Sequence, residues 1–333
     1  MILDGRDPAC VQRAAQALRA GELLGLPTET VYGLAADADH DAAVARIFAA
    51  KGRPSDHPLI VHVADASGVD HYASEVPAFA RALLQRFWPG PLTLILPRRP
   101  EVAAAAAGGQ NSIGLRCPAH PVAHELLRTA RELGVQGVAA PSANQFGRVS
   151  PTTAAHVQDE FDAGLLILDG GACEVGIEST IVDCTRGAPV LLRPGRITRE
   201  QIEAASGQRL YDRDELAAPA PRASGTLEAH YAPRAKVRLM DGQALQTALD
   251  VLGRDFDGGK ATIAVYARSI LRVPSAKLLY RRMPDDAAIA AQQLFAALRD
   301  FDAQGVSLIW VEQPPQTPDW EGVRDRLQRA AAS

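Results

Sequence analysis

The sequence of 333 residues is poor in cysteine. Its four cysteines, Cys10, Cys117, Cys173 and Cys184, form no C-x-x-C pair. This pattern argues against a zinc knuckle and against a redox dithiol. Because no secretory signal accompanies them, we expect the four to be reduced thiols with a structural role.

Long hydrophobic runs and an excess of positive charge are also missing. No apolar stretch approaches the roughly 20 residues that cross a bilayer. The opening residues, M-I-L-D-G-R-D-P, have neither a basic start nor a signal-like apolar core. We therefore expect a cytoplasmic protein without a membrane partner. The net charge is −4 and the pI about 6.1, so no global basic field predicts binding of nucleic acid, although a local basic pocket remains open.

The familiar catalytic and nucleotide-binding fingerprints are absent as well. The sequence contains no G-x-x-x-x-G-K-[ST] and no G-x-G-x-x-G that opens a helix. Neither a Ser-His-Asp order nor a glycosidase-like pair of carboxylates can be argued. A nucleotide would therefore have to bind by another device.

What is present is the composition of a soluble globular protein, with 47% hydrophobic and 22% charged residues. The length favours two domains. In the first 207 residues, predicted strands often follow one another without a helix between them. That order favours a twisted mixed α/β sheet over an all-parallel one. The strands are expected at 22–26, 59–63, 92–96, 112–116, 138–140, 165–169, 180–183 and 190–193, and 28–37 is expected to be a loop.

The composition changes after this part of the chain. Residues 208–233 are rich in proline and alanine and show little periodicity, which is typical of a linker. Residues 234–333 then carry a pattern of four strands and three helices. This part is predicted to form a small α/β domain of its own.

Two cations stand close together at the end of a predicted helix. Lys51 and Arg53 flank Gly52, and Pro54 restricts the loop that follows. An anion such as a phosphate would relieve their mutual repulsion. The alternative is a solvated helix end whose cations complement the helix dipole, and these residues alone do not decide between the two.

Polar residues also follow several predicted strands. The stretches are P-S-A-N at 141–144, G-I-E-S-T at 176–180 and R-P-G-R at 193–196. Open α/β sheets place ligands beside the ends of their strands. A turn chosen for its asparagine and proline explains the first stretch equally well.

Three histidines invite a functional interpretation. His62 lies inside the apolar strand L-I-V-H-V, where a satisfied core histidine is the simpler interpretation. His120 and His124 have the i, i+4 spacing of a metal-binding pair. Without a third ligand nearby, the spacing favours a pair on the surface.

Taken together, these stretches resemble one family, the Sua5/YrdC family of threonylcarbamoyl-adenylate synthases, in its two-domain Sua5 form. The motifs occur in the family's order and cover nearly all of the first 200 residues, whereas the last 100 match in length, coarse pattern and one motif. The matching motifs are P-T-E-T-V-Y-G-L (27–34), K-G-R-P-S-D-H-P-L-I-V-H (51–62), S-I-G-L-R-C-P (112–118), A-P-S-A-N-Q-F-G-R-V-S-P-T (140–152), G-I-E-S-T-I-V-D (176–183), L-R-P-G (192–195) and H-Y-A-P (230–233).

The resemblance implies a fold and a reaction. It implies a YrdC-like catalytic domain at 1–207, a linker at 208–233 that folds over the active site, and a Rossmann-like Sua5 domain at 234–333. The enzyme would be a nucleotidyltransferase that makes threonylcarbamoyl-AMP and pyrophosphate from L-threonine, bicarbonate and ATP, with Mg²⁺. The product would serve the t6A37 modification of tRNA, through a separate transferase complex. We expect a monomer or a weak oligomer.

The resemblance also implies which residues bind the substrates. Lys51 and Arg53 would act at the phosphates and are the catalytic candidates, and no metal ligand is assigned. His57 stands where many members have asparagine, and Asn111-Ser112 where Asp-Thr is common, but both keep their hydrogen-bonding capacity. L-threonine would contact Thr30, His62, Arg116, Ala140 and Ser179, and ATP would contact Arg53, His57, Ser112, Ser142, Ser150, Arg193 and Tyr231.

Two other functions compete with this one. The related carbamoyltransferases also carry a YrdC-like module, but join it to zinc-binding or kinase-like modules that this chain lacks. A non-catalytic RNA-binding module is the second alternative. The acidic pI counts against it, and a steep salt dependence of RNA affinity would support it.

Overall fold

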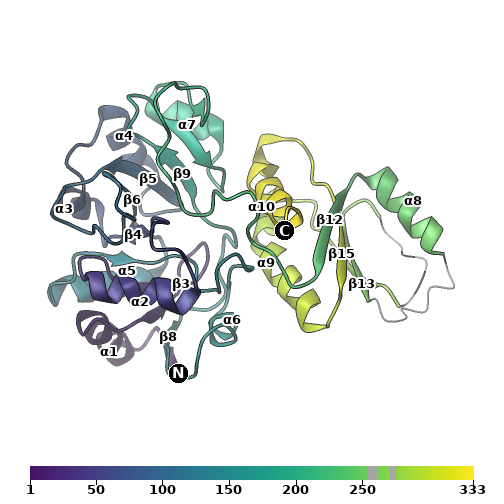
Figure 1. Cartoon of the computed structure of the whole chain (residues 1–333), viewed down its shortest axis with the longest axis horizontal. Helices are drawn as coiled ribbons and strands as arrows, with labels where there is room; N and C mark the ends of the chain where they lie inside the picture. The colour runs from purple at the N-terminus through teal and green to yellow at the C-terminus, as the bar shows by residue number, and fades with distance from the viewer. Residues whose placement is uncertain (254–261, 271–272, 274, 276) are drawn as a thin grey trace. The chain divides into compact units, whose positions relative to one another are not determined.

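The computed structural model describes residues 1–253, 262–270, 273, 275 and 277–333 (Figure 1). The chain divides into two compact units. The first unit comprises Met1–Phe146 and Ser150–Thr226, and the second comprises Gly147–Val149 and Leu227–Ser333. The first unit thus continues beyond residue 207 into the segment for which the composition predicts a linker.

The first unit is built on one large mixed sheet, as predicted. Eleven strands lie in the order β1-β8-β2-β3-β7-β4-β6-β5-β9-β10-β11. Neighbours are parallel in some pairs, such as β4 and β6, and antiparallel in others, such as β2 and β3. The strands are β1 (Ile2–Asp4), β2 (Leu24–Leu26), β3 (Gly33–Asp37), β4 (Ile60–His62), β5 (Leu92–Pro97), β6 (Ser112–Arg116), β7 (Val138–Ala139), β8 (Leu166–Asp169), β9 (Thr180–Asp183), β10 (Val190–Arg193) and β11 (Tyr211–Asp212).

Capping residues mark the ends of some helices of this unit. Asp7 caps α1 by accepting a hydrogen bond from the Ala9 amide. Helix α2 ends at Gly52, whose φ of 61° is readily adopted by glycine and turns the chain into Arg53. The helices are α1 (Pro8–Arg19), α2 (Asp41–Lys51), α3 (Val69–Tyr72), α4 (Ala78–Phe87), α5 (Pro121–Glu132), α6 (Ala154–Gln158) and α7 (Arg199–Ser206), with a 3-10 turn η1 (Ala66–Gly68).

Separate apolar clusters hold the helices against the sheet. Helices α1 and α5 share one cluster with β2, and helices α2, α4 and α7 share another with β5 and β6. A third cluster joins the inward side chains of β5, β9 and β10 to Leu216, Ala220 and Ala223. The segment after β11 therefore packs on this part of the sheet, and burial of apolar area stabilises it there.

Two expectations about local structure are wrong. Residues 28–37 were expected to form a loop, yet Gly33–Asp37 is strand β3, paired with β2 and β7. Its sequence G-L-A-A-D has low strand propensity, so pairing on both sides overrides the local preference. Gly33 also suits a close approach, because a Cβ there would lie 3.1 Å from the Ala140 Cβ. The run of five alanines at 103–107 also predicts a helix, yet residues 104–107 form turns.

The second unit is a smaller α/β domain, as predicted. Its sheet has the order β12-β15-β13-β14, and every pairing is parallel. Among the described residues, no helix of either unit is long and apolar enough to cross a membrane. The elements are β12 (Lys236–Met240), α8 (Gly242–Leu252), β13 (Ile263–Ala267), β14 (Leu279–Arg282), α9 (Ala287–Ala303), β15 (Leu308–Glu312), η2 (Pro318–Trp320) and α10 (Glu321–Ala331).

Candidate active site

Arg116, the last residue of β6, stands at the centre of a buried polar cluster. Arg116 is only 4% exposed. The Nη1 atom donates a hydrogen bond to Thr30 Oγ1 at 2.7 Å, and Nε donates to the Gly90 carbonyl at 3.3 Å. The Nη2 atom lies 2.7 Å from Glu29 Oε1 in a buried ion pair. The strand end and the loop after β2 therefore bring a cation, a carboxylate and a hydroxyl together.

Several atoms of this cluster are buried without a hydrogen bond. Among the described residues, Arg116 Nη2, both carboxylate oxygens of Glu29 and His62 Nδ1 have no hydrogen-bond partner. His62 is the register partner of Arg116 between β4 and β6, so the two side chains emerge on the same face of the sheet. Buried polar groups are nearly always satisfied in proteins. Arg116 Nη2 and Glu29 Oε1 have only their mutual ion pair, and Glu29 Oε2 and His62 Nδ1 have no partner, so the cluster indicates a binding site for a small polar ligand.

The electrostatics of the cluster keep His62 neutral. Burial lowers its pKa to about 3, and the positive charge of Arg116 contributes to the same shift. A neutral imidazole has one donor nitrogen and one acceptor nitrogen. His62 can therefore bind a ligand group by hydrogen bonding without adding charge.

The loop that carries Thr30 is fixed by its own hydroxyl groups. Thr28 Oγ1 donates to the Val31 carbonyl at 2.6 Å and lies 2.9 Å from Thr30 Oγ1. It also accepts the Val31 amide at 3.2 Å. Such local bonds between side chain and backbone hold a turn without regular secondary structure. Thr30 is therefore presented to Arg116 by a preorganised loop.

A second group of predicted residues meets at Arg193, the last residue of β10. Its Nη2 donates to Ser179 Oγ at 3.1 Å and its Nε to the Ser179 carbonyl at 3.0 Å. Ser179 Oγ also lies 2.7 Å from Thr93 Oγ1. Arg193 Nη1 donates to the Ser224 carbonyl at 2.9 Å. The structure thus brings Ser179 and Arg193 together and adds Ser224, which sequence reasoning did not single out.

Lys51 is not the solvated helix end that its local sequence allowed. Lys51 is 2% exposed, and its Nζ donates to the carbonyl of Ser142 at 2.6 Å and to that of Asn144. Burial holds the pKa of Lys51 well below its usual range, and the charge of Arg53 adds to this effect. The lysine therefore ties the end of α2 to the P-S-A-N turn.

Arg53 lies beside the same turn. Its Nη2 donates to the Pro58 carbonyl at 3.0 Å and to Ser224 Oγ at 3.5 Å. The guanidinium also stands 5.6 Å from the centre of the Phe146 ring, within the range of a cation–π contact. Arg53 and Arg193 therefore both contact Ser224, which brings these two predicted ATP residues to one place.

Two more of the predicted ATP residues, His57 and Ser112, lie close to residues that contact Arg53. His57 is half-buried and meets Phe146 edge-on, with ring centres 5.5 Å apart. Ser112 lines a cavity with Thr93 and Ser224.

The remaining predicted residues have the following surroundings. Ser150 Oγ donates to Glu178, and the Ala140 amide donates to the Ile60 carbonyl at 3.0 Å. Tyr231 belongs to the second unit, where it is buried at a φ of 62° with its ring 5.3 Å below the Arg326 guanidinium. Its place over a nucleotide stays a prediction.

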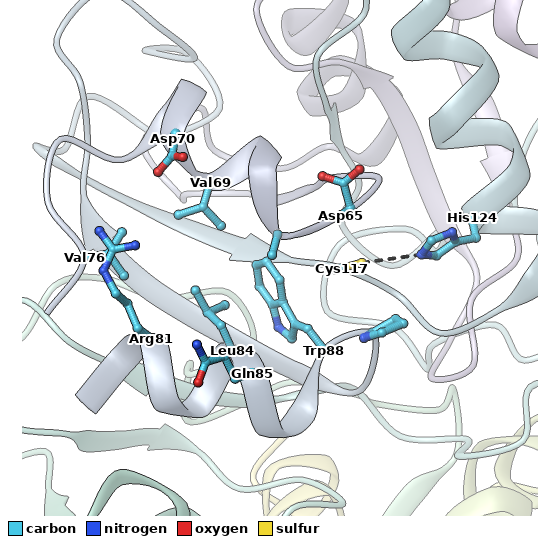
Figure 2. A pocket seen from close by; sticks show the side chains of 12 residues that line it. Asp65, Val69, Asp70, Val76, Arg81, Leu84, Gln85, Trp88, Cys117 and His124 are labelled. Carbon is cyan, nitrogen blue, oxygen red and sulfur yellow. Dashed lines mark hydrogen bonds between the residues drawn. The ribbon is translucent and has the colours of Figure 1, made fainter. Parts of the chain in front are cut away.

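A separate cavity of about 340 Å³ is lined by Cys117, the residue that follows Arg116, among others (Figure 2). Trp88 and Leu84 line it on one side, and Cys117 and His124 lie on the other, with Sγ 3.7 Å from Nε2. Burial raises the pKa of Cys117 to about 12, so its thiol is protonated at neutral pH. All four cysteines of the chain are free thiols.

The expectation that His120 and His124 form a surface pair is wrong. His120 is buried at the start of α5, where its Nδ1 accepts the Val122 amide at 3.2 Å. Its Nε2 lies 3.2 Å from the Gly170 carbonyl, and His124 contacts Cys117 instead. The spacing therefore reflects a capping role and a packing role.

Glu29 is another residue of the candidate site that sequence reasoning missed. The signal was a glutamate between two threonines, directly after a buried strand. A carboxylate in such a place needs a buried cation, and Arg116 supplies it. The partner could not be identified in advance, because 86 positions separate Arg116 from Thr30 along the chain.

Comparisons with known proteins cover both parts of the chain. A family profile described as "Telomere recombination" matches residues 16–195, and one described as "Threonylcarbamoyl-AMP synthase, C-terminal domain" matches residues 197–332. The chain is 39% identical to the threonylcarbamoyl-AMP synthase of Bacillus subtilis, over 99% of this chain and 94% of that protein. It is 38% identical to that of Pyrococcus abyssi, over 96% of this chain and 94% of that protein.

A solved structure extends the likeness to the fold. The crystal structure of P. abyssi Sua5 complexed with L-threonine matches with a TM-score of 0.87 at 35% identity, covering 99% of this chain and 97% of that one. The two family profiles and this solved structure together cover both units of the chain. The chain therefore belongs to the Sua5/YrdC family of threonylcarbamoyl-AMP synthases, in the form in which a Sua5 C-terminal domain follows the YrdC-like domain.

Proposed function

We propose that this chain is an L-threonylcarbamoyladenylate synthase, a nucleotidyltransferase that converts L-threonine, bicarbonate and ATP into threonylcarbamoyl-AMP and pyrophosphate. One observation carries the proposal. The buried cluster of Arg116, Thr30 and His62 contains a guanidinium nitrogen whose one contact is the ion pair with Glu29, and an imidazole nitrogen without a hydrogen-bond partner among the described residues. These atoms match the polar groups of a small amino acid.

The cluster supports a specific mode of threonine binding. Arg116 would hold the substrate carboxylate through Nη2, which a planar guanidinium does well. Thr30 and His62 would bind the remaining polar groups, and Ser179, which Arg193 orients, would lie at the junction with ATP. The Ala140 backbone completes this predicted set.

ATP would bind where Arg53 and Arg193 converge. In this proposal both arginines exchange their present contacts with Ser224 for phosphate oxygens. Lys51 would neutralise phosphate charge and also fix the turn that carries Ser142. The family resemblance alone proposes that Tyr231 and the 208–233 segment close over the nucleotide. The full predicted set is Arg53, His57, Ser112, Ser142, Ser150, Arg193 and Tyr231.

The chemistry needs positioning more than a covalent nucleophile. The threonine amine attacks the carbon of bicarbonate, which gives a carbamate and releases water. A carbamate oxygen then attacks the α-phosphorus of ATP, and the bond to pyrophosphate breaks. Since the carbamate is unstable in water, a buried site protects it. Fixed cations would stabilise the charge that develops on the phosphates.

Mg²⁺ fits this site only together with the nucleotide. Among the residues that the structure describes, no group of three histidine, cysteine, aspartate or glutamate side chains could hold a metal ion. Mg²⁺ commonly binds through substrate phosphates, water and one or two carboxylates. We therefore propose that Mg²⁺ enters on the triphosphate, whose charge it would neutralise.

The product has a place in tRNA modification. A mixed anhydride of a carbamate and AMP is labile, so it would be consumed soon after its release. The family relation supports delivery to a separate transferase complex that forms t6A37 on tRNA, with tRNA as an indirect partner. The enzyme would work in the cytoplasm as a monomer or weak oligomer.

The test is pyrophosphate release by the purified full-length chain. We expect release that requires ATP, L-threonine and bicarbonate together, with threonylcarbamoyl-AMP identified by mass spectrometry. The control omits one substrate at a time and replaces threonine and bicarbonate with carbamoyl phosphate. Absence of threonine-dependent release contradicts the proposal, and release with carbamoyl phosphate alone would indicate a carbamoyltransferase instead.

A further inference from the structure

Glu29 is a buried carboxylate that lies against the proposed threonine site without serving any structural hydrogen bond through its side chain. It is 5% exposed, and its one charged contact is the ion pair with Arg116. Among the described residues, neither of its oxygens accepts a hydrogen bond. Its backbone carbonyl, by contrast, accepts the Val175 amide at 2.7 Å, so the main chain is fixed while the carboxylate lacks donors.

The negative charge of Glu29 and the positive charge of Arg116 are complementary to the two charges of an amino acid. An α-amino acid is a zwitterion whose carboxylate matches Arg116 and whose ammonium matches Glu29. Such a ligand adds no net charge to the buried site. A 2-hydroxy acid carries the carboxylate alone, so its binding would leave a buried negative charge without a partner, which is costly.

We propose that Glu29 is a catalytic residue that binds the α-ammonium group of the amino acid substrate and accepts its proton. This inference rests on the proposed function, since it assigns a step of the same reaction. His62 then binds the β-hydroxyl as a neutral hydrogen-bonding partner. The site thereby selects for both the amino group and the side chain of threonine.

The proton transfer makes the amine a nucleophile. The ammonium gives one proton to the Glu29 carboxylate, which leaves a neutral amine and a carboxylic acid. The amine nitrogen forms a bond to the carbon of bicarbonate, and water leaves, so that an N-carboxylated amino acid with two negative charges remains, one on its α-carboxylate and one on the new carbamate. The Glu29 proton returns to solvent before the next turnover. An ammonium has no lone pair, so the N–C bond cannot form without this step.

Binding measurements test the recognition step. Calorimetry compares L-threonine with 2,3-dihydroxybutyrate of the same configuration, in which a hydroxyl replaces the amino group. We expect wild type to prefer threonine by at least about 100-fold, and Glu29→Gln to reduce this preference to within about fivefold. The control, Glu22→Gln, changes an exposed glutamate before β2 and should keep the wild-type preference.

Kinetic measurements test the proton transfer separately. We expect Glu29→Gln to lower threonine-dependent pyrophosphate release by about 100-fold at saturating threonine. The same variant should keep, within about threefold, the formation of ATP from threonylcarbamoyl-AMP and pyrophosphate. That reverse step breaks the bond to AMP and does not require an amine to be deprotonated, so a purely structural role for Glu29 would slow both reactions together.

The outcomes separate this inference from the proposed function. If wild type shows no threonine-dependent pyrophosphate release, the proposed function fails. If wild type is active and Glu29→Gln keeps both the forward rate and the preference for threonine, the role of Glu29 is overturned. Should Glu29→Gln fail to fold, Glu29→Asp replaces it in both assays. It is expected to keep the preference and lose forward rate by about tenfold, and an unchanged forward rate would contradict the proton transfer.

Discussion

Two buried glutamates, one in each unit, show how differently a carboxylate can be used in this chain. Glu312, at the end of β15, accepts hydrogen bonds from the Arg268 amide, the Ser269 amide and Ser269 Oγ, each at 2.7 Å. Glu29 is equally buried and accepts none among the described residues. Burial therefore does not distinguish the two carboxylates. What distinguishes Glu29, and supports its proposed role, is hydrogen-bonding capacity that no described residue uses.

The first unit contains its own structural counterpart. Asp183, which is fully buried, accepts from the Thr185 amide at 2.9 Å and from its hydroxyl at 2.7 Å, and it pairs with Arg186 at 2.8 Å. The difference therefore lies between individual sites and not between the two units. Asp183 and Glu312 stabilise loops, whereas Glu29 and its neighbours are held in place by the fold and left with capacity for a ligand.

Removing Arg116 should give the largest effect. Arg116→Ala is expected to lower kcat/KM for threonine by about 10³-fold, because it removes the carboxylate partner and leaves Glu29 buried without a cation. The matched control is Arg128→Ala, which removes exposed ion pairs on α5 and should change kcat/KM less than twofold. Steady-state kinetics on folded protein, verified by circular dichroism, decides it. If Arg116→Ala kept the wild-type kcat/KM for threonine, the cluster around Arg116 would have a structural role, like the hydrogen bonds of Glu312.

Arg193 tests the other half of the proposed site. Arg193→Ala should raise the KM for ATP by about 10- to 100-fold, the magnitude of one or two charge-assisted hydrogen bonds. The KM for threonine should change by less than about fivefold, since its contact passes through Ser179. Kinetics with one substrate varied at a time measures both. An equal rise in both constants would argue against separate subsites.

Glu312 should affect stability alone. Glu312→Gln is expected to lower the free energy of unfolding of its unit by about 2 kcal/mol. The reason is that the hydrogen bonds accepted by its two carboxylate oxygens lose their charge assistance and weaken. Denaturant unfolding with a probe in the second unit measures this, and the KM for threonine serves as the internal control. A changed KM for threonine would break the contrast with Glu29.

The last prediction concerns the pH dependence of stability through His62. Its pKa of about 3 in the folded chain lies below the ordinary value of 6.5, so the unfolded chain binds the extra proton first as pH falls. The stability that follows from the neutral imidazole is complete above pH of about 6.5 and is lost toward pH of about 3, by up to about 1.4 kcal/mol per pH unit. Unfolding at pH 7 and pH 5 should show this slope, and His62→Gln should reduce it. An equal slope in both proteins would contradict the assignment.

Much of this architecture could be predicted from the sequence, because its signals are local. Asp7 followed by Pro8 is typical of a helix start and predicts α1, and the strand expected at 112–116 is β6. The mixed sheet and the second α/β unit followed from the order of strands and helices, and the family motifs indicated the reaction.

The parts that could not be predicted depend on contacts between distant residues. Strand β3 exists because β2 and β7 flank it, and neither neighbour is visible in G-L-A-A-D. The contacts of Lys51 with the carbonyls of Ser142 and Asn144 could not be predicted from its local sequence, and its role at phosphates stays a prediction. Glu29 was overlooked because its cation lies far along the chain. These partners appear only when the sheet is assembled.

The pairing of His62 with Arg116 has a consequence for how this family can vary in length. Between the two residues lie α3, α4 and β5, and loops joining such elements tolerate insertions at small cost. A single residue inserted inside β4 or β6 would instead shift the alternation of side chains along that strand by one position. His62 or Arg116 would then point to the opposite face of the sheet. Relatives can therefore differ by many residues between the two strands and keep the same site. They cannot differ by one residue within either strand and keep it.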